Sequence, residues 1–398
     1  MDTVLIRDLV QRQEVEIKTG PFGTQLKASE YVNKGTPVLN VRNLGFSTVN
    51  TEKLEMVGDE TLERLCAHKL HTGDIVFGRK GAVERHAFIS EYEDGWMQGS
   101  DCIRLRVKTE KINTRYLSYY FLTPQHRAFM ISMCSHGTTM ASLNQKIIEM
   151  ISIPLPERKV QDQVVAVLNV LDEKIKSNRK INDNLYAQAK AIFDDHFINI
   201  DSIPVGWRKG NLLDIANYSN GLAMQKFRPQ GNEIGLPVLK IRELRQGSCD
   251  NSSELCSLSI KPEYIVHDGD VIFSWSGSLL VDIWCGGTCG LNQHLFKVTS
   301  DVYDKWFYYL WTAHHLARFI AIAADKATTM GHIKREELAK AEVLIPCEED
   351  YMSISSIMQP IFELIISNRV EAHKMAALRD ELLPKLISGE IDVSTVQL

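Results

Sequence analysis

The feature that most constrains the fold is an internal repeat. Phrases recur in the same order in the two halves: PVLNVRNL (37–44) with PVLKIREL (237–244), GDIVFGRKG (73–81) with GDVIFSWSG (269–277), and GSDCIRLRV (99–107) with GLNQHLFKV (290–298). The offset falls from 200 to 196 to 191 and settles at 190, where TTM at 138 matches TTM at 328 and IKSNR (175–179) matches IISNR (365–369). A kept order with a drifting offset indicates a duplicated unit whose loops differ in length.

Each repeat begins with short runs of β-branched and aromatic residues broken by Gly, Asn and Asp, which is typical of strands joined by turns. An aromatic helical stretch follows, RYLSYYFLTPQHRAFM from Arg115 and WFYYLWTAHHLARFIAIAA from Trp306. We interpret these aromatics as the buried face of a core helix that packs on a sheet. Each globule should therefore be of the α+β class.

Each repeat ends in a long amphipathic segment. Apolar residues recur at steps of three and four in both segments, at Val164, Val167, Leu171, Ile181, Leu185 and Ile192, and at Ile354, Ile357, Ile361, Ile365, Ala372, Met375 and Leu382. Roughly forty residues at 1.5 Å each make a helix of about 60 Å. We expect the two helices to pack antiparallel as a coiled coil, with one globule at each end and a pseudo-twofold axis between the repeats. Pro360 predicts a kink or a break in the second helix.

An asparagine lies in each seam, at Asn178 and Asn368, and the offset of 190 aligns them. Seam asparagines commonly fix the register of a coiled coil. The pair therefore either meets near the axis and sets the register or lies at the solvent edge of the seam.

The expected architecture is two globular α+β domains separated by two long antiparallel helices. The predicted limits are residues 1–156 for the first domain, 157–200 for the first helix, 201–346 for the second domain, and 347–398 for the second helix and tail.

Composition is that of an ordinary globular protein, with 44% hydrophobic and 24% charged residues and a formal net charge of −5. No segment is basic overall, so contact with nucleic acid would need Lys and Arg residues clustered on one face of a neutral domain. No apolar run of eighteen residues predicts a membrane span, the N-terminus does not resemble an export signal, and the eight cysteines are scattered. We therefore expect free thiols and a cytoplasmic location.

Catalytic motifs are missing from the sequence. It contains no GxxxxGK[ST], HExxH or GxSxG and no glycine-rich dinucleotide or methyl-donor fingerprint, and CGGTC at 285–289 has no second cysteine pair. We therefore expect no metal, and a binding or scaffolding protein is favoured over an enzyme.

The order of globule, long helix, globule, long helix resembles the specificity subunit of type I restriction-modification systems. The motifs that carry the resemblance are P-V-L-x-[VI]-R-x-L, G-D-[VI]-[VI]-F, a TTM loop and a strand ending in I-P, each present twice, with PFGTQLK at 21–27, NQHLFKV at 292–298 and LLPKLISGEI at 382–391. The resemblance covers nearly the whole chain.

This resemblance implies a non-catalytic subunit in which each globule reads one half of a bipartite double-stranded DNA target while the helices set the gap. It also implies two adenine methyltransferase (modification) subunits and optional restriction motor subunits as partners, with the methyl donor and ATP bound by those partners. Two readers on one duplex must be spaced near a helical turn, which a stiff helix pair can hold. The target adenine has to leave the duplex to be methylated.

Candidate DNA contacts are polar residues in loops beside the repeated strands. In the first domain they are Lys18, Gln25, Lys27, Arg42, Asn43, Arg79, Lys80, Arg85, His86, His136, Thr138 and Thr139. In the second they are Gln225, Lys226, Arg228, Arg242, Glu243, Ser274, Trp275, Ser276, Lys326, Thr328 and Thr329. Arginine suits a guanine edge, asparagine or glutamine an adenine edge, and lysine or threonine a phosphate.

The halves differ where GRKG becomes SWSG, so we expect different half-sites and an asymmetric target. Arg42 and Arg242 match each other and form either a phosphate clamp, which we prefer, or a shared structural ion pair. Three alternatives remain: a coiled-coil adaptor that binds proteins, an enzyme with a site built from Asp282, Cys285, Cys289 and His294, and a relative that binds DNA for phage defence without methylation.

Overall fold

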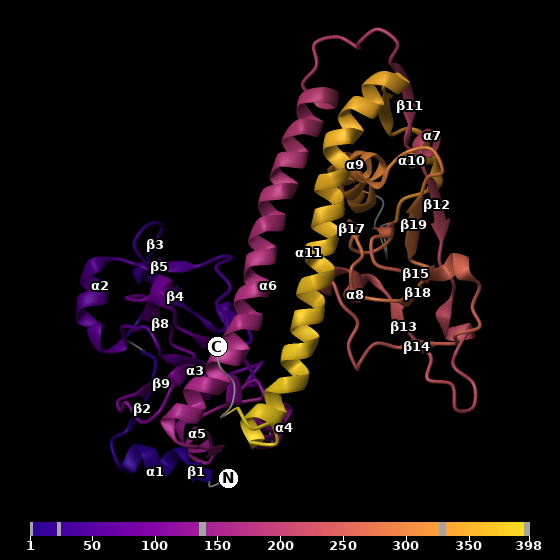
Figure 1. Cartoon of the computed structure of the whole chain (residues 1–398). Coiled ribbons are helices and arrows are strands. Elements are labelled where there is room, and N and C mark those ends of the chain that lie inside the picture. The colour runs from indigo at the N-terminus through magenta and orange to yellow at the C-terminus, as the bar shows by residue number, and fades with distance from the viewer. Residues whose placement is uncertain (1–2, 22–24, 135–140, 326–331, 394–398) are drawn as a thin grey trace. The chain divides into compact units, whose positions relative to one another are not determined.

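The computed structural model describes residues 3–21, 25–134, 141–325 and 332–393. The chain divides into two compact units (Figure 1): unit 1 comprises Met1–Asp172 and Ala377–Leu398, and unit 2 comprises Glu173–Ala376. Each long helix contributes one part to each unit.

The described part of unit 1 contains ten short strands. They are β1 (Thr3–Leu5), β2 (Val15–Thr19), β3 (Tyr31–Val32), β4 (Thr36–Leu39), β5 (Glu55–Val57), β6 (Ile75–Gly78), β7 (His86–Phe88), β8 (Met97–Gln98), β9 (Cys102–Val107) and β10 (Ser152–Pro154). Its α-helices are α1 (Ile6–Gln11), α2 (Asp59–Arg64), α3 (Thr114–Tyr120), α4 (Pro124–Cys134), α5 (Gln145–Glu149), the start of α6 (Arg158–Phe193) and the end of α11 (Glu348–Ser388).

Unit 2 repeats this plan. Its strands are β11 (Arg208–Asn211), β12 (Asn217–Asn220), β13 (Leu236–Leu239), β14 (Leu255–Cys256), β15 (Ile265–Val266), β16 (Val271–Ser274), β17 (Leu280–Ile283), β18 (Cys289–Leu291), β19 (Leu295–Thr299) and β20 (Glu342–Ile345). Its α-helices are the rest of α6, α7 (Leu212–Ile215), α8 (Ile241–Gln246), α9 (Lys305–Asp325), α10 (Arg335–Ala339) and most of α11 (Glu348–Ser388).

The strand orders confirm the internal repeat. The sheet β2-β9-β6-β7 of unit 1 matches β12-β19-β16-β17 of unit 2, and the antiparallel pair β1-β10 matches β11-β20. In the second sheet of each unit the repeated PVL strand has a parallel neighbour, β4 with β8 and β13 with β18. The two units therefore share one topology, which is α+β as expected.

Strand pairing corrects one offset. Phe77 of β6 pairs with Ile103, whereas its equivalent Phe273 pairs with Phe296, so β9 and β19 correspond at an offset of 193 and not 191. The offset of 191 comes from matching the glycine and the valine at the two ends of GSDCIRLRV and GLNQHLFKV. A shift of two residues keeps every side chain on the same face of the sheet, so the pattern alone cannot detect it.

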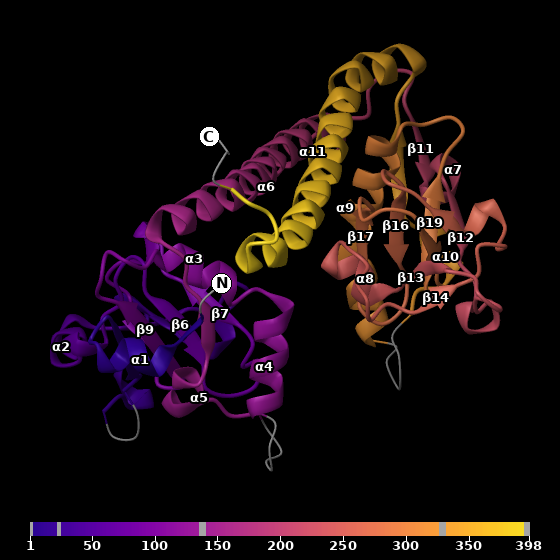
Figure 2. The same ribbon diagram turned by 60° about the horizontal axis from the view of Figure 1, so that its bottom comes forward.

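The aromatic stretches form the cores, as expected. In unit 2 α9 lies between the sheet and α11 (Figure 2), and its Trp306, Phe307 and Trp311 are buried. In unit 1 Tyr116 and Tyr119 of α3 are buried in the corresponding cluster. Burial of these rings attaches each sheet to the helices of its own unit.

The stretch in unit 1 is two helices rather than one. It breaks between Tyr120 and Pro124, which is the first residue of α4. Proline lacks an N–H and restricts the residue before it, so it fits the first turn of a helix better than the interior. The equivalent position in unit 2 is His314, and α9 runs through it unbroken.

The long helices pack antiparallel where they share a unit. In unit 2 the side-chain amide of Asn178 donates to the Asn368 carbonyl, and that of Asn182 donates to the Ile365 carbonyl. Residue numbers thus increase along α6 as they decrease along α11. The antiparallel pairing is confirmed, whereas the pseudo-twofold axis and the placement of the globules at opposite ends remain predictions.

The buried seam differs in detail from the predicted one. On α6 it follows Leu168, Leu171, Ile175 and Asn178, while Ile181 is exposed. On α11 Ile357 is likewise exposed, and the seam passes through Ile354, Met358, Phe362 and Ile365. Apolar residues at steps of three and four can lie on either of two adjacent faces of a helix. Which face is buried depends on the tertiary packing.

Pro360 does not break α11, which is continuous from Glu348 to Ser388. Figure 2 shows α11 bent towards its N-terminal end, the half that contains Pro360. A bend without a break is the usual response of a helix to an interior proline.

Candidate nucleic-acid interface

A cavity lies at one end of the main sheet of unit 1. Its walls come from the end of β2, the residue after β6, the start of β9 and the segment at α5, and its volume is about 520 Å³. The residues of this unit 1 cavity are Thr19, Arg79, Ile103, Asn144, Gln145 and Lys146.

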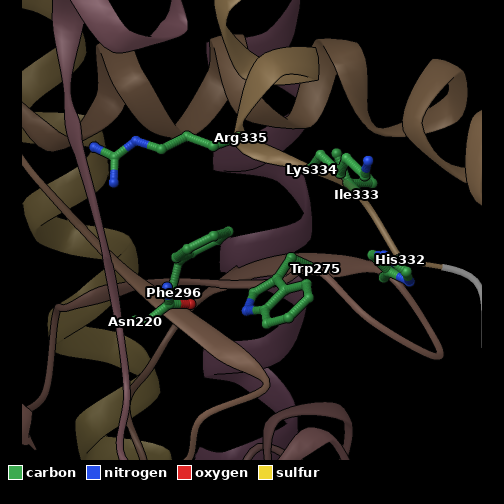
Figure 3. Close-up of a pocket in the computed structure, with 7 residues that line it drawn as sticks. All are labelled: Asn220, Trp275, Phe296, His332, Ile333, Lys334 and Arg335. Atoms are coloured by element: carbon green, nitrogen blue, oxygen red, sulfur yellow. The ribbon is translucent and has the colours of Figure 1, made fainter.

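Unit 2 has a cavity in the corresponding place, with a volume of about 260 Å³ (Figure 3). The residues of this unit 2 cavity are Asn220, Trp275, Phe296, His332, Ile333, Lys334 and Arg335. Figure 3 shows the Trp275 indole between Phe296 and His332, with Lys334 and Arg335 on the opposite side. The ring centroid of Trp275 lies 5.7 Å from that of Phe296 and 6.3 Å from that of His332.

The walls of the two cavities are equivalent position by position. Thr19 and Asn220 each end the first strand of the sheet, and the paired strands equate Ile103 with Phe296. The repeated phrase places Arg79 and Trp275 one residue after β6 and β16. At the offset of 190, Asn144 and Gln145 correspond to Lys334 and Arg335.

The backbone holds residues 79 and 275 in the same way. The Arg79 carbonyl accepts a hydrogen bond from the Leu143 N–H at 2.8 Å, and the Trp275 carbonyl accepts one from the Ile333 N–H at 2.9 Å. Two residues later, Gly81 and Gly277 both have positive φ, 78° and 66°. Only glycine adopts this conformation without strain, so the turn that presents the two side chains is fixed by the backbone.

The side chains at equivalent positions of the two cavities differ in chemistry. Beside Arg79, Lys80 forms an exposed ion pair with Asp101 at 3.4 Å. In unit 2 the counterparts of Lys80 and Asp101 are Ser276 and His294, which hydrogen-bond each other at 3.0 Å. The unit 1 cavity is thus polar and cationic, whereas the unit 2 cavity combines aromatic rings with the cations Lys334 and Arg335.

Cations at both cavities are available for a ligand. The side chains of Arg79, Lys146, Lys334 and Arg335 have no ion pair or hydrogen bond within the described part of the chain. An unpaired cation keeps its full charge for an anionic partner, which is how a domain of neutral composition can attract DNA.

Other predicted contacts are exposed but paired within their own unit. Arg42 binds Glu55 at 3.0 Å, Arg228 binds Glu254 at 2.6 Å and Arg242 binds Glu243 at 2.6 Å. Arg42 and Arg242 therefore both form exposed ion pairs, but their partners do not correspond, so the ion pair is not shared between the repeats and the phosphate clamp stays a prediction. Gln25, Lys27, Arg85, Gln225 and Lys226 are exposed, and Lys18 is partly exposed on β2.

Five predicted contacts are buried. Asn43 donates to the carbonyls of Asn50 and Glu52, Glu243 holds Arg242, Ser274 donates to the Ser276 carbonyl, Ser276 pairs with His294, and His86 pairs with Ser118 at 2.9 Å. Burial, with smaller contributions from His126 and Arg115, lowers the pKa of His86 to about 3. We assign these five side chains structural roles in place of DNA contacts. The loop pattern did not reveal them because burial is set by the neighbouring elements.

Six predicted contacts lie outside the described residues: His136, Thr138, Thr139, Lys326, Thr328 and Thr329. Conversely, the sequence reasoning missed the cavity residues Thr19, Asn144, Gln145, Lys146, Asn220, His332, Lys334 and Arg335. The repeat contained the signal, because Asn144–Lys146 and residues 334–336 follow the two TTM phrases at the same distance.

The seam asparagines meet in unit 2. Asn178 is 1% exposed, and its amide donates to the Asn368 carbonyl at 3.2 Å and to the Glu371 carboxylate at 2.8 Å. The amide of Asn368 donates to the Asn182 side-chain oxygen at 2.9 Å. Asn182 was missed by the sequence reasoning because its repeat counterpart is Ala372.

The residues of the alternative enzyme site have other partners. Asp282 is held by Arg369 and His294 by Ser276. Over the described ranges, no group of three or more His, Cys, Asp and Glu side chains is placed to bind a metal ion.

Comparison with known families matches both repeats. A model described as the type I restriction modification DNA specificity domain matches residues 22–187 and again residues 204–373. The chain belongs to this family. A member of it is a DNA-recognition subunit and not the catalytic component of the system.

Named relatives agree with this family. The MjaIX specificity subunit of a type I restriction enzyme from Methanocaldococcus jannaschii is 25% identical over 312 residues, 72% of this chain and 71% of the relative. A putative MjaX specificity subunit from the same organism is 20% identical over 91% of this chain and 88% of the relative. The crystal structure of the type I S subunit from M. genitalium has the same fold, with a TM-score of 0.59, 12% identity, and coverage of 97% of this chain and 96% of that chain.

A search of the described helices for a membrane span finds none of sufficient length and apolarity.

Proposed function

We propose that the chain reads a bipartite, asymmetric sequence in duplex DNA, with one half-site read by each unit. It acts with DNA and with methyltransferase and restriction subunits, as a specificity subunit of a type I system does. Two methyltransferase subunits bind one copy of the chain, and restriction motor subunits are optional. The methyl donor and ATP are bound by these partners, and the chain works in the cytoplasm.

The observation that carries the proposal is the pair of equivalent cavities. If two units of one topology both bind DNA, the side chains that contact the bases should come from equivalent positions. Residues 79 and 275 are equivalent and line the cavities of the two units. Because the side chains there differ, the two half-sites should differ as well. An adaptor for proteins would not need unpaired cations at this place in both units.

The pair of long helices sets the length of the gap between the half-sites. The Asn178 and Asn368 contacts support a fixed register, because a shifted register would leave the buried Asn178 amide without its two acceptors. We propose the domain limits of 1–156, 157–200, 201–346 and 347–398 on the same basis, since α6 begins at Arg158 and α11 at Glu348.

Long-read methylation mapping of the host genome, with and without the gene, tests this function. The expected result is the loss of a single methyladenine motif with two unlike parts separated by a fixed gap. A palindromic motif or a motif without a gap would contradict the proposal. If no motif is lost, the gene should be expressed with its methyltransferase partner in a host free of methylation, where failure to create a motif would refute it.

A further inference from the structure

We propose that residues 79 and 275 are the equivalent base-reading positions of the two units, where Arg79 recognises a guanine and Trp275 recognises the methyl group of a thymine. This inference rests on the proposed function and deepens it, because it names the bases that the two cavities read.

The first step is the contrast between a fixed backbone and a changed side chain. The carbonyls of both residues are held by equivalent hydrogen bonds of 2.8 and 2.9 Å, and both turns continue into a glycine of positive φ. The two positions thus point their side chains from the same place in the fold. A planar cation in one unit and an indole in the other share little beyond that location.

The second step separates base contacts from phosphate contacts. Every base pair of a duplex carries the same phosphates, so a phosphate contact should have similar chemistry in both units. Both cavities contain cations that suit phosphate: Lys146 in unit 1, and Lys334 and Arg335 in unit 2. Trp275 cannot bind a phosphate by charge, so the position that it shares with Arg79 carries sequence information instead.

The third step assigns guanine to Arg79. Its guanidinium is partly exposed at the cavity wall and has no acceptor within the described residues, unlike Arg42 and Arg242, which are held by carboxylates. A free guanidinium fork matches the O6 and N7 acceptors of guanine in the major groove.

The fourth step assigns thymine to Trp275. The indole lies beside Phe296, His332 and His294, so this side of the cavity offers aromatic surface. Its buried N–H has no partner among the described residues, so the contacts of the indole there are ring contacts. In the major groove, thymine is the base that presents a methyl group to such a surface.

The experiment is a selection from a randomised duplex library, using the full chain co-expressed with its methyltransferase partner. Wild type is compared with Arg79→Ala, Arg79→Lys, Trp275→Ala and Trp275→Phe. We expect Arg79→Ala to abolish a guanine preference at one position of one half-site, a discrimination of about ten- to hundred-fold. Arg79→Lys should weaken it, because an ammonium lacks the planar fork that holds the O6 and N7 acceptors together.

Trp275→Ala should abolish a thymine preference in the other half-site only, while Trp275→Phe should keep it. Duplexes with uracil in place of that thymine lack only the methyl group and should bind wild type about threefold to fivefold more weakly. The same duplexes should bind Trp275→Ala as well as the thymine duplex. For Arg79, a 7-deazaguanine duplex provides the matching test.

The outcomes separate the two claims. If wild type selects no two-part motif, the proposed function fails and this inference fails with it. If wild type selects such a motif but the alanine variants select the same one, the base assignment is wrong and the function stands. Uniformly weaker binding by Arg79→Ala, with the guanine preference kept, would make Arg79 a phosphate contact, and equal binding of uracil and thymine duplexes by wild type would overturn the role of Trp275.

Discussion

The Asp282 and Arg369 pair should be a main attachment of the second recognition domain to the long helix α11. The Arg369 guanidinium binds both carboxylate oxygens of Asp282 on β17, at 2.8 and 2.7 Å. The hydrogen bonds and charge of Asp282 raise the pKa of Arg369 even though burial opposes this. Replacing Asp282 with Asn keeps the shape and leaves the arginine without its counter-charge.

The size of the effect follows from burial. Removing one partner of a fully buried pair costs about 3–5 kcal/mol, and an exposed pair contributes about 0–1 kcal/mol. The side chains of Arg369 and Asp282 are 30% and 27% exposed, so an intermediate value applies. We expect Asp282→Asn to cost about 2 kcal/mol, which lowers Tm by about 4–8 °C in a unit of this size.

Thermal unfolding followed by tryptophan fluorescence is the assay, because five of the six tryptophans lie in unit 2. The matched control is Glu342→Gln, which breaks the Lys209–Glu342 pair; its length is also 2.7 Å, but its side chains are 58% and 60% exposed. The control should lower Tm by less than about 4 °C. Equal shifts in both variants, or none in Asp282→Asn, would refute the reasoning that burial decides the strength of the pair.

Three further predictions concern the helices and the first unit. Replacing both Asn178 and Asn368 with Leu should leave the chain folded but blur the gap in the methylation motif, and an unchanged gap would remove their role in register. Inserting two helical turns within residues 185–192 should lengthen the gap and leave both half-sites intact, as mapped methylation would show. Burial lowers the pKa of His86 and of His126 to about 3, so between pH 6.5 and 3 the unfolded chain binds protons that the folded one does not. Unit 1 should therefore lose about 1.4 kcal/mol per pH unit for each histidine as the pH falls below about 6.5, and a flat profile of unfolding free energy against pH would contradict this.

The internal repeat determined most of the architecture. Because recurring phrases marked equivalent strands, the sequence alone predicted two units of one α+β topology, each completed by a long helix. It also located Arg79 and Trp275 as an equivalent pair with different chemistry. Periodicity and phrase order are local properties of a chain, which is why they could be read without coordinates.

Tertiary structure decided which side chains face outward and which positions meet. His86 and Asn43 are polar residues of the kind that contact DNA from loops, yet neighbouring elements bury them. The cavities unite residues more than a hundred positions apart, such as Thr19 and Gln145, whose side chains hydrogen-bond at 2.9 Å. Burial and such long-range contacts depend on how strands and helices pack together, and a pattern of period two or of three to four cannot encode them.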